Sequence, residues 1–150
     1  MQLAGLAEGV QGQDILHFIE APEYAEVLED ARGLKLTDDG TVYVTSEQRG
    51  QLLKIVDGKI EQHSLVPSAF EDEDLGGIDV LPDGRLVIVN EGSGKVGVLN
   101  SGLEPEILFS SSGGSVGELD DPLAVAVSVN GNIFVGDVKN RQVSVFNHQG

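Results

Sequence analysis

The sequence contains no cysteine and no tryptophan, and only two tyrosines occur among its 150 residues. Without cysteine, the chain can form neither disulfides nor cysteine-ligated zinc sites, and thiolate catalysis is excluded. The shortage of large aromatic residues indicates modest aromatic packing, whereas 20 glycines indicate many turns. The chain is long enough to bury one core, and its 40% hydrophobic content is typical of a soluble globular domain.

Basic residues are also scarce. Nine Lys and Arg residues face 25 Asp and Glu residues, which gives a formal net charge of −16. Such a surface repels phosphate backbones, so the composition argues against DNA or RNA as a partner and favours cations and basic partners. The same charge also serves simply to keep the protein soluble.

Long apolar runs are missing as well. No stretch approaches the roughly 18 apolar residues of a membrane span, so we expect no membrane partner. The N-terminal stretch MQLAGLAEGVQGQD has no basic region before its apolar residues, which disfavours a secretory signal and favours a cytoplasmic location. An exported protein whose signal had been removed would look the same. We treat residues 1–150 as a single domain with an N-terminal extension at 1–13.

Three similar decapeptides dominate the chain. They align through Gly40, Gly84 and Gly131, which are spaced by 44 and 47 residues. A period of this size indicates a repeated supersecondary unit. The decapeptides are DDGTVYVTSE (38–47), PDGRLVIVNE (82–91) and VNGNIFVGDV (129–138).

Each repeat is predicted to be β structure. Asp-Gly or Asn-Gly between two apolar runs predicts a hairpin in which both turn residues adopt positive φ. The strand before the turn (strand A) is short and mostly apolar, and the strand after it (strand B) is apolar on both faces. We therefore expect sheets on both sides of strand B, with Val44, Ile88 and Val135 buried in equivalent places.

The later strands of each repeat, C and D, are more polar. Buried inner strands and polar outer strands predict the all-β blades of a β-propeller, each with four antiparallel strands. The segment 22–31 has apolar residues at helical spacing, and we predict a linker with a helical turn there.

The last repeat contains a recognisable set of residues: Pro122, Gly131, Asn132, Ile133, Asp137, Asn140, Arg141, Val143, Val145, Phe146 and Gly150. On these residues it resembles an NHL repeat. It departs from that pattern at Ala124 and Ser128, and the two earlier repeats look as much like the SMP-30/gluconolactonase and strictosidine-synthase-like six-bladed propellers. The resemblance implies a six-bladed ring whose ligands bind at the mouth of a central channel.

The number of strands points to a homodimer. Residues 14–20 lie where an outer D strand belongs, which gives the order D, ABCD, ABCD, ABC and three blades per chain. A propeller ring needs about four to eight blades, so two copies would close a six-bladed ring. Residues 14–20 of one copy would then pair with residues 142–147 of the other. Alternatively, the 150 residues are part of a longer propeller chain.

Polar residues at the predicted channel mouth are the candidate ligand-binding site, for a small molecule or a protein. Arg32 and Lys35 would suit an anionic ligand. In an alternative interpretation Lys35 and Asp79 form an ion pair in the channel wall, and Asp137 holds a loop together with Asn140 and Arg141. The predicted site residues are Arg32, Lys35 and Asp79 on A strands and Ser46, Asn90, Glu91 and Asp137 at the ends of B strands.

The resemblance to lactonases implies a metal at this mouth. Asn90, Glu91 and Asp137 supply the hard oxygen ligands that suit calcium or another divalent cation, which would polarise a lactone carbonyl. The glutamate that this family has at the start of strand A is missing here, which weakens the lactonase interpretation. Our leading hypothesis is therefore a non-enzymatic NHL-like binding scaffold without catalytic residues or a required cofactor. The alternative is a divalent-metal-dependent lactonase of the SMP-30 type.

Overall fold

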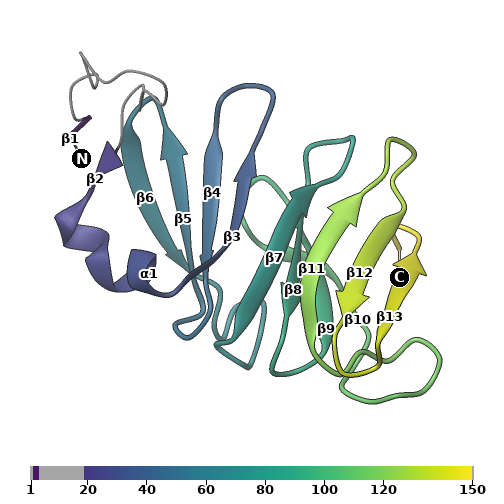
Figure 1. The fold of residues 1–150 in the computed structure, drawn as a ribbon. Coiled ribbons are helices and arrows are strands. Elements are labelled where there is room, and N and C mark those ends of the chain that lie inside the picture. The colour runs from purple at the N-terminus through teal and green to yellow at the C-terminus, as the bar shows by residue number, and fades with distance from the viewer. Residues whose placement is uncertain (1, 4–18, 150) are drawn as a thin grey trace, which may run out of the picture.

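The computed structural model describes residues 2–3 and 19–149, and residues 31–146 form three antiparallel sheets set side by side like a fan (Figure 1). The first sheet has the order β3 (Ala31–Leu36), β4 (Val42–Ser46), β5 (Gln51–Val56), β6 (Lys59–Ser64). The second has the order β7 (Leu75–Val80), β8 (Leu86–Asn90), β9 (Lys95–Leu99), β10 (Pro105–Phe109). The third has the order β11 (Pro122–Val127), β12 (Ile133–Asp137), β13 (Gln142–Phe146).

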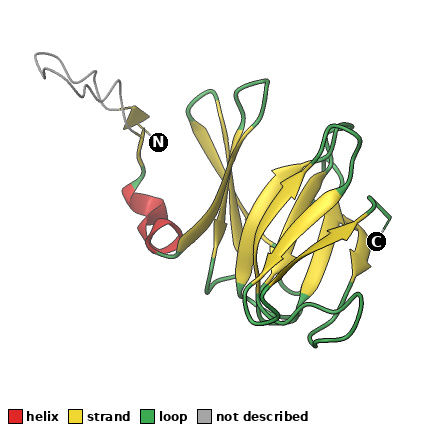
Figure 2. Cartoon of the chain, turned by 45° about the vertical axis from the view of Figure 1, so that its right-hand side comes forward, coloured by secondary structure: helices red, strands yellow, loops and turns green. Residues whose placement is uncertain are grey.

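These sheets are the blades of a β-propeller, as the sequence predicts. The A strands β3, β7 and β11 lie next to one another along the inner edge of the fan, and strands β6 and β10 lie on the outer edge. Figure 2 shows the sheets stacked face to face, with the helix beside the first sheet. Among the described residues the third sheet has no D strand, because β13 pairs only with β12.

The hairpin turns differ from the expected type. Gly40, Gly84 and Gly131 have φ values of 87°, 93° and 85°, but the Asp or Asn before each glycine keeps a negative φ. Each glycine amide donates to the carbonyl three residues earlier, as in a type I turn followed by a glycine bulge. The expectation of two positive φ values was therefore wrong for these turns. It holds instead for Asp57 and Gly58, between β5 and β6, with φ values of 48° and 80°.

The B strands are buried on both faces. Val44, Ile88 and Val135 are 5%, 0% and 0% exposed, which confirms their predicted burial. One core lies between the first and second sheets, and Phe70 from the loop before β7 is part of it. Another core lies between the second and third sheets and includes Val87. Strand β8 is covered on both sides because its side chains alternate between these two cores.

The inner strands approach one another backbone to backbone. A Cβ on Gly77 would lie 2.9 Å from the carbonyl oxygen of Leu123, and one on Gly33 would lie 2.8 Å from that of Gly76. The buried Thr45 hydroxyl accepts from the Gly33 amide at 2.9 Å and donates to the Gly76 carbonyl at 2.7 Å. The first two blades are thus joined by a hydrogen-bonded contact that has no room for a side chain at these glycines.

The segment before β3 contains the predicted helical turn, as helices η1 (Pro22–Tyr24) and α1 (Ala25–Glu29). No helix within the described ranges has the length and apolar character needed to cross a membrane. Strand β2 (Ile19–Glu20), at the end of the predicted D strand, pairs with β1 (Gln2–Leu3). The remainder of the predicted D strand at 14–20, and most of the predicted extension at 1–13, lie outside the described residues.

We predict that Ile88→Ala lowers the free energy of unfolding by about 2–5 kcal/mol, because it opens a cavity in a fully buried strand. Urea unfolding followed by circular dichroism measures this change. Val129→Ala is the control, since Val129 is 98% exposed in a turn and its truncation should change stability by less than about 0.5 kcal/mol. A cost below about 1 kcal/mol for Ile88→Ala would contradict the packing described here.

Candidate functional site

The predicted site residues separate into two groups at opposite ends of the inner strands. Arg32 lies where β3 begins, and Ser46, Asn90 and Asp137 lie where the B strands end. We call this the loop end. Lys35 and Asp79 lie near the other end of their strands, beside the A–B turns, which we call the turn end. Since a strand rises about 3.3 Å per residue, Lys35 lies roughly 10 Å further along β3 than Arg32.

At the loop end, Asn90 and Asp137 hold loops together. The fully buried Asn90 side chain donates to the carbonyl of Asp72 at 2.7 Å and accepts from the amide of Ser93 at 2.9 Å. Asp137 accepts from the amide of Asp120 at 3.0 Å and from the side chain of Asn140 at 2.8 Å. Each residue therefore fastens the B–C turn to the loop before strand A, and the loop-holding alternative for Asp137 and Asn140 is confirmed.

Ser46 occupies the equivalent position in the first blade. It ends β4 as Asn90 ends β8, and it is fully buried. Its hydroxyl has no hydrogen-bond partner in the part of the chain that the structure describes. The loop-holding hydrogen bonds that Asn90 and Asp137 make in the second and third blades are therefore missing from the first.

Arg32 forms ion pairs with two carboxylates, those of Glu91 and Glu47. Its Nε lies 2.9 Å from Oε1 of Glu91, its Nη2 lies 3.3 Å from Oε2 of the same residue, and Glu47 lies 3.6 Å away. The hydrogen bond to Glu91 raises the pKa of Arg32 above its usual range. Burial raises the pKa of Glu91, and this outweighs the opposite effect of Arg32. The guanidinium is thus already occupied in a bidentate pair.

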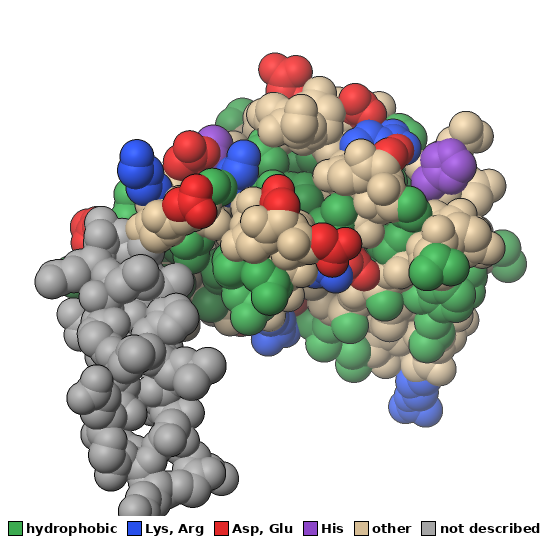
Figure 3. Space-filling model, turned by 90° about the horizontal axis from the view of Figure 1, so that it is seen from above, with side chains coloured by type: hydrophobic (Ala, Val, Ile, Leu, Met, Phe, Trp, Pro, Cys, Tyr) green, Lys and Arg blue, Asp and Glu red, His purple; other side chains and the backbone are tan. Residues whose placement is uncertain are grey.

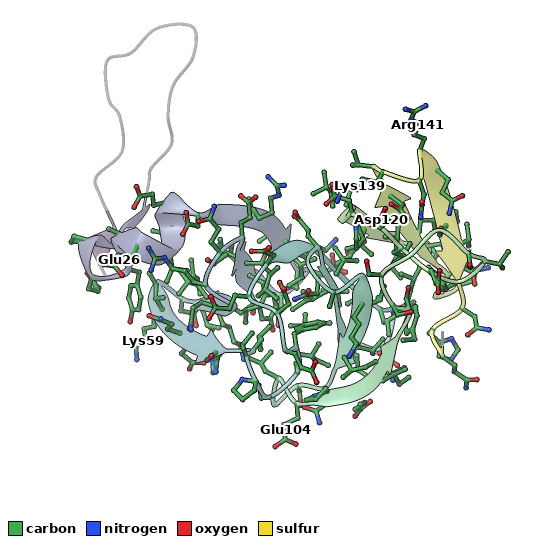
Figure 4. The ribbon with its side chains drawn as sticks, turned by 90° about the horizontal axis from the view of Figure 1, so that it is seen from below. Glu26, Lys59, Glu104, Asp120, Lys139 and Arg141 are labelled. Atoms are coloured by element: carbon green, nitrogen blue, oxygen red, sulfur yellow. The ribbon has the colours of Figure 1, made fainter. Side chains whose placement is uncertain are left out.

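A hollow of about 210 Å³ at the loop end is lined mostly by carboxylates. Its lining includes Asp74, Glu91, Asp121, Asp120 and Lys139, and the last two are labelled near each other in Figure 4. Burial, with help from neighbouring carboxylates, raises the pKa of Asp74. No group of three or more His, Cys, Asp or Glu side chains within residues 2–3 and 19–149 is arranged to hold a metal ion.

The predicted metal ligands Asn90, Glu91 and Asp137 already have other partners. The oxygens of Asn90 and Asp137 accept hydrogen bonds from separate loops, and Glu91 binds Arg32. A divalent cation at these three residues would have to displace those contacts. The donor set therefore does not fit the expected metal.

At the turn end, one carboxylate connects all three blades. Nζ of Lys35 lies 2.8 Å from Oδ1 of Asp79, so the ion pair expected as an alternative is present. Oδ2 of Asp79 accepts from the amide of Val127 at 2.7 Å, and Oδ1 accepts from that of Val80 at 2.7 Å. Burial raises the pKa of Asp79, but the hydrogen bonds from Lys35, Val127 and Val80 outweigh it, so the net pKa is lower than usual.

A larger hollow, of about 660 Å³, lies beside this carboxylate, and residues of all three A–B turns line it. On this face of the molecule, seen from above in Figure 3, Asp and Glu side chains lie among hydrophobic ones. The sequence interpretation missed several of its residues, although the repeated turns could have indicated them. Equivalent turns of repeats arranged around an axis must lie at the same end. The missed residues include Thr37, Asp39, Tyr43, Val127 and Ser128.

Comparisons with known proteins support the fold alone. No family model matches the chain, and no curated protein matches its sequence. Among solved structures, virginiamycin B lyase from Staphylococcus aureus is similar with a TM-score of 0.59 at 16% identity over 79% of this chain. A streptogramin B lyase has a TM-score of 0.67 at 16% identity over 81% of this chain. A proposed 6-phosphogluconolactonase from Bacteroides fragilis NCTC 9343 has a TM-score of 0.60 at 18% identity over 88% of this chain.

This chain spans 41%, 38% and 37% of those three proteins, respectively. The similarity confirms a β-propeller fold and does not single out the NHL or SMP-30 families. At such low identity it carries no assignment of activity, because one fold hosts many functions.

We predict that Asp137→Ala lowers the free energy of unfolding by about 1–3 kcal/mol, because it leaves the amides of Asp120 and Asn140 without their acceptor. Chemical denaturation measures the loss. Ser46→Ala is the matched control at the equivalent position, and we expect little change because the Ser46 hydroxyl has no described partner. Equal losses of unfolding free energy for the two variants would argue against a stabilising role for the loop hydrogen bonds of Asp137.

We predict that Asp79 contributes stability that disappears in acid. Its folded pKa is lowered, so its contribution is present above the unfolded pKa of about 3.9 and is lost as pH falls through the folded pKa. The difference in unfolding free energy between the wild type and Asp79→Asn should therefore shrink as pH falls from about 7 to 3. Lys35→Met should also weaken the acid dependence, because Lys35 holds the carboxylate ionised. A difference that stays constant with pH would contradict this account.

Proposed function

We propose that this protein is a non-enzymatic binding module whose ligand occupies the turn-end hollow. The main observation in support is that all three A–B turns and the Lys35–Asp79 pair border one hollow of about 660 Å³. Small-molecule sites commonly have volumes of about 300–1,000 Å³ and combine apolar walls with a few fixed polar groups. Tyr43, Val80 and Val127 supply apolar wall here, and Asp79 is held in place by its three hydrogen-bond partners.

The charge of the hollow favours a ligand that carries a cationic group. Its basic side chain, Lys35, is already paired with Asp79. Asp38 and Asp39 add two carboxylates to the lining, so acidic groups are in excess. The net charge of −16 has the same sign and would attract a cation from a distance. The anionic ligand considered from the sequence has less support, because an anion would have to displace the carboxylates paired with Arg32 and Lys35 against the net negative charge of the chain.

The hydroxyl groups at this hollow favour binding over catalysis. Thr37 donates to Asp39, and Ser128 donates to Asn130 within its own turn, so both hydroxyls are engaged in turn structure. No observation at the loop end favours the metal-dependent lactonase, since Asn90 and Asp137 are engaged in loop hydrogen bonds.

Two probes of equal shape and opposite charge test this proposal. Benzamidine, a cation at neutral pH, should bind with roughly millimolar affinity, and benzoate should bind at least about tenfold more weakly. In amide-detected NMR, benzamidine should shift the resonances of residues 35–43, 79–84 and 127–129. Asp39→Asn should weaken binding, and Asp57→Asn, on the β5–β6 turn away from the hollow, is its matched control. Equal binding of both probes, or shifts confined to the loop end, would overturn the proposal.

A further inference from the structure

The two outermost sheets each have an apolar face that no described residue fully covers. On the third sheet, Phe134, Val143 and Val145 are 39%, 65% and 55% exposed. On the first sheet, Leu34 and Leu36 are 71% and 64% exposed. Figure 2 shows that these sheets stand at the two ends of the fan.

The open face of the third sheet has the residues of a face between blades. Strand pairing makes Phe134 equivalent to Val87, and Val145 equivalent to Val98. Val87 and Val98 are fully buried because the third sheet packs on them. Phe134 and Val145 are more exposed than Val87 and Val98 because no further sheet follows the third one in the described chain. The rows Ala126–Phe134–Val145 and Ala124–Gly136–Val143 cross this face.

The open face of the first sheet is the opposite half of such an interface. Leu34 pairs with Val44 as Ile78 pairs with Ile88, so Leu34 is equivalent to Ile78. Ile78 is only 6% exposed because it packs against the first sheet, whereas Leu34 has no covering sheet. The face is therefore built to receive the face of a preceding blade.

Helix α1 does not block this face, because it occupies the place of a linker between blades. Phe70, in the linker before β7, is buried in the core between the first two sheets. Val27 of α1 is buried in the same way, against Val44 and Leu53 on the open face of the first sheet. The chain before β3 is thus arranged as the linker before β7 is, with a blade expected on its far side.

We propose that a second copy of this chain covers both faces and closes a ring of six blades. Each copy presents the two halves of one repeating interface at opposite ends, so one copy supplies what each end of the other lacks. Two such contacts related by a two-fold axis make a closed dimer without unpaired faces. The second copy would also place its first inner strand beside β11, so that Lys35 of one copy adjoins Ala126 of the other as Lys35 adjoins Asp79 within the chain.

Light scattering coupled to size-exclusion chromatography tests the proposal on the full chain. The wild type should have twice the 15.8 kDa mass of one chain at micromolar concentrations. Val145→Asp and Leu34→Asp, which alter opposite faces, should each weaken the dimer at least about tenfold. Both side chains are exposed, so these changes leave the cores intact. Val129→Asp is the matched control, because Val129 is equally apolar and 98% exposed but lies in the turn between β11 and β12.

Cross-linking tests the arrangement of the two copies separately. Because the chain contains no cysteine, only the introduced cysteines can react. A double variant with Lys35→Cys and Ala126→Cys should give a covalent dimer with a short bis-maleimide, and neither single variant should. A monomeric wild type, an open ladder of higher oligomers, or a dimer unaffected by both face variants would overturn the proposal. These measurements report mass and proximity, so their failure is distinct from failure of the benzamidine experiment.

Discussion

The backbone contact between neighbouring inner strands is the constraint on which the rest of the structure depends. Gly33, Gly76 and Gly77 have no side chains, so the inner strands meet while the outer strands diverge, which produces the fan of sheets. The Thr45 hydroxyl fixes the first contact by bonding to backbone groups on both strands. The same proximity lets Asp79 reach Lys35 on one side and the Val127 amide on the other. The turn-end site is therefore a consequence of how closely the blades pack.

Equivalent positions keep their backbone role while their side chains diverge. The B–C turn requires positive φ at Gly50, Gly94 and Arg141, with values of 58°, 67° and 54°. Two copies meet this requirement with glycine, and the third accepts the strain of a larger residue. The ends of the B strands behave in the same manner, since Asn90 and Asp137 form clamps that Ser46 does not form. Repetition thus maintains the fold, and individual repeats are free to lose particular interactions.

The sequence predicts the elements better than it predicts the site. Repeat spacing and apolar runs place the strands, their order and the burial of Ile88, because these depend on hydrophobic pattern. The pattern cannot show whether a polar atom faces a ligand or a neighbouring loop. Asn90 and Asp137 have the chemistry of metal ligands, yet backbone amides from loops use their oxygens. The turn type was also missed, because Asp-Gly permits both a two-residue turn and a glycine bulge.

The distribution of charge also bears on which ligands the turn-end hollow can attract. Arg49 and Arg85, like Arg32 and Lys35, lie within ion-pairing distance of carboxylates. Exposed ion pairs contribute little stability, so pairing alone would not prevent an anion from competing for these bases. The excess of 25 acidic over nine basic residues does oppose anion binding, because an approaching anion meets a negative potential before it reaches any base. The cation preference that we propose for the turn end would therefore come from the whole chain as much as from Asp79.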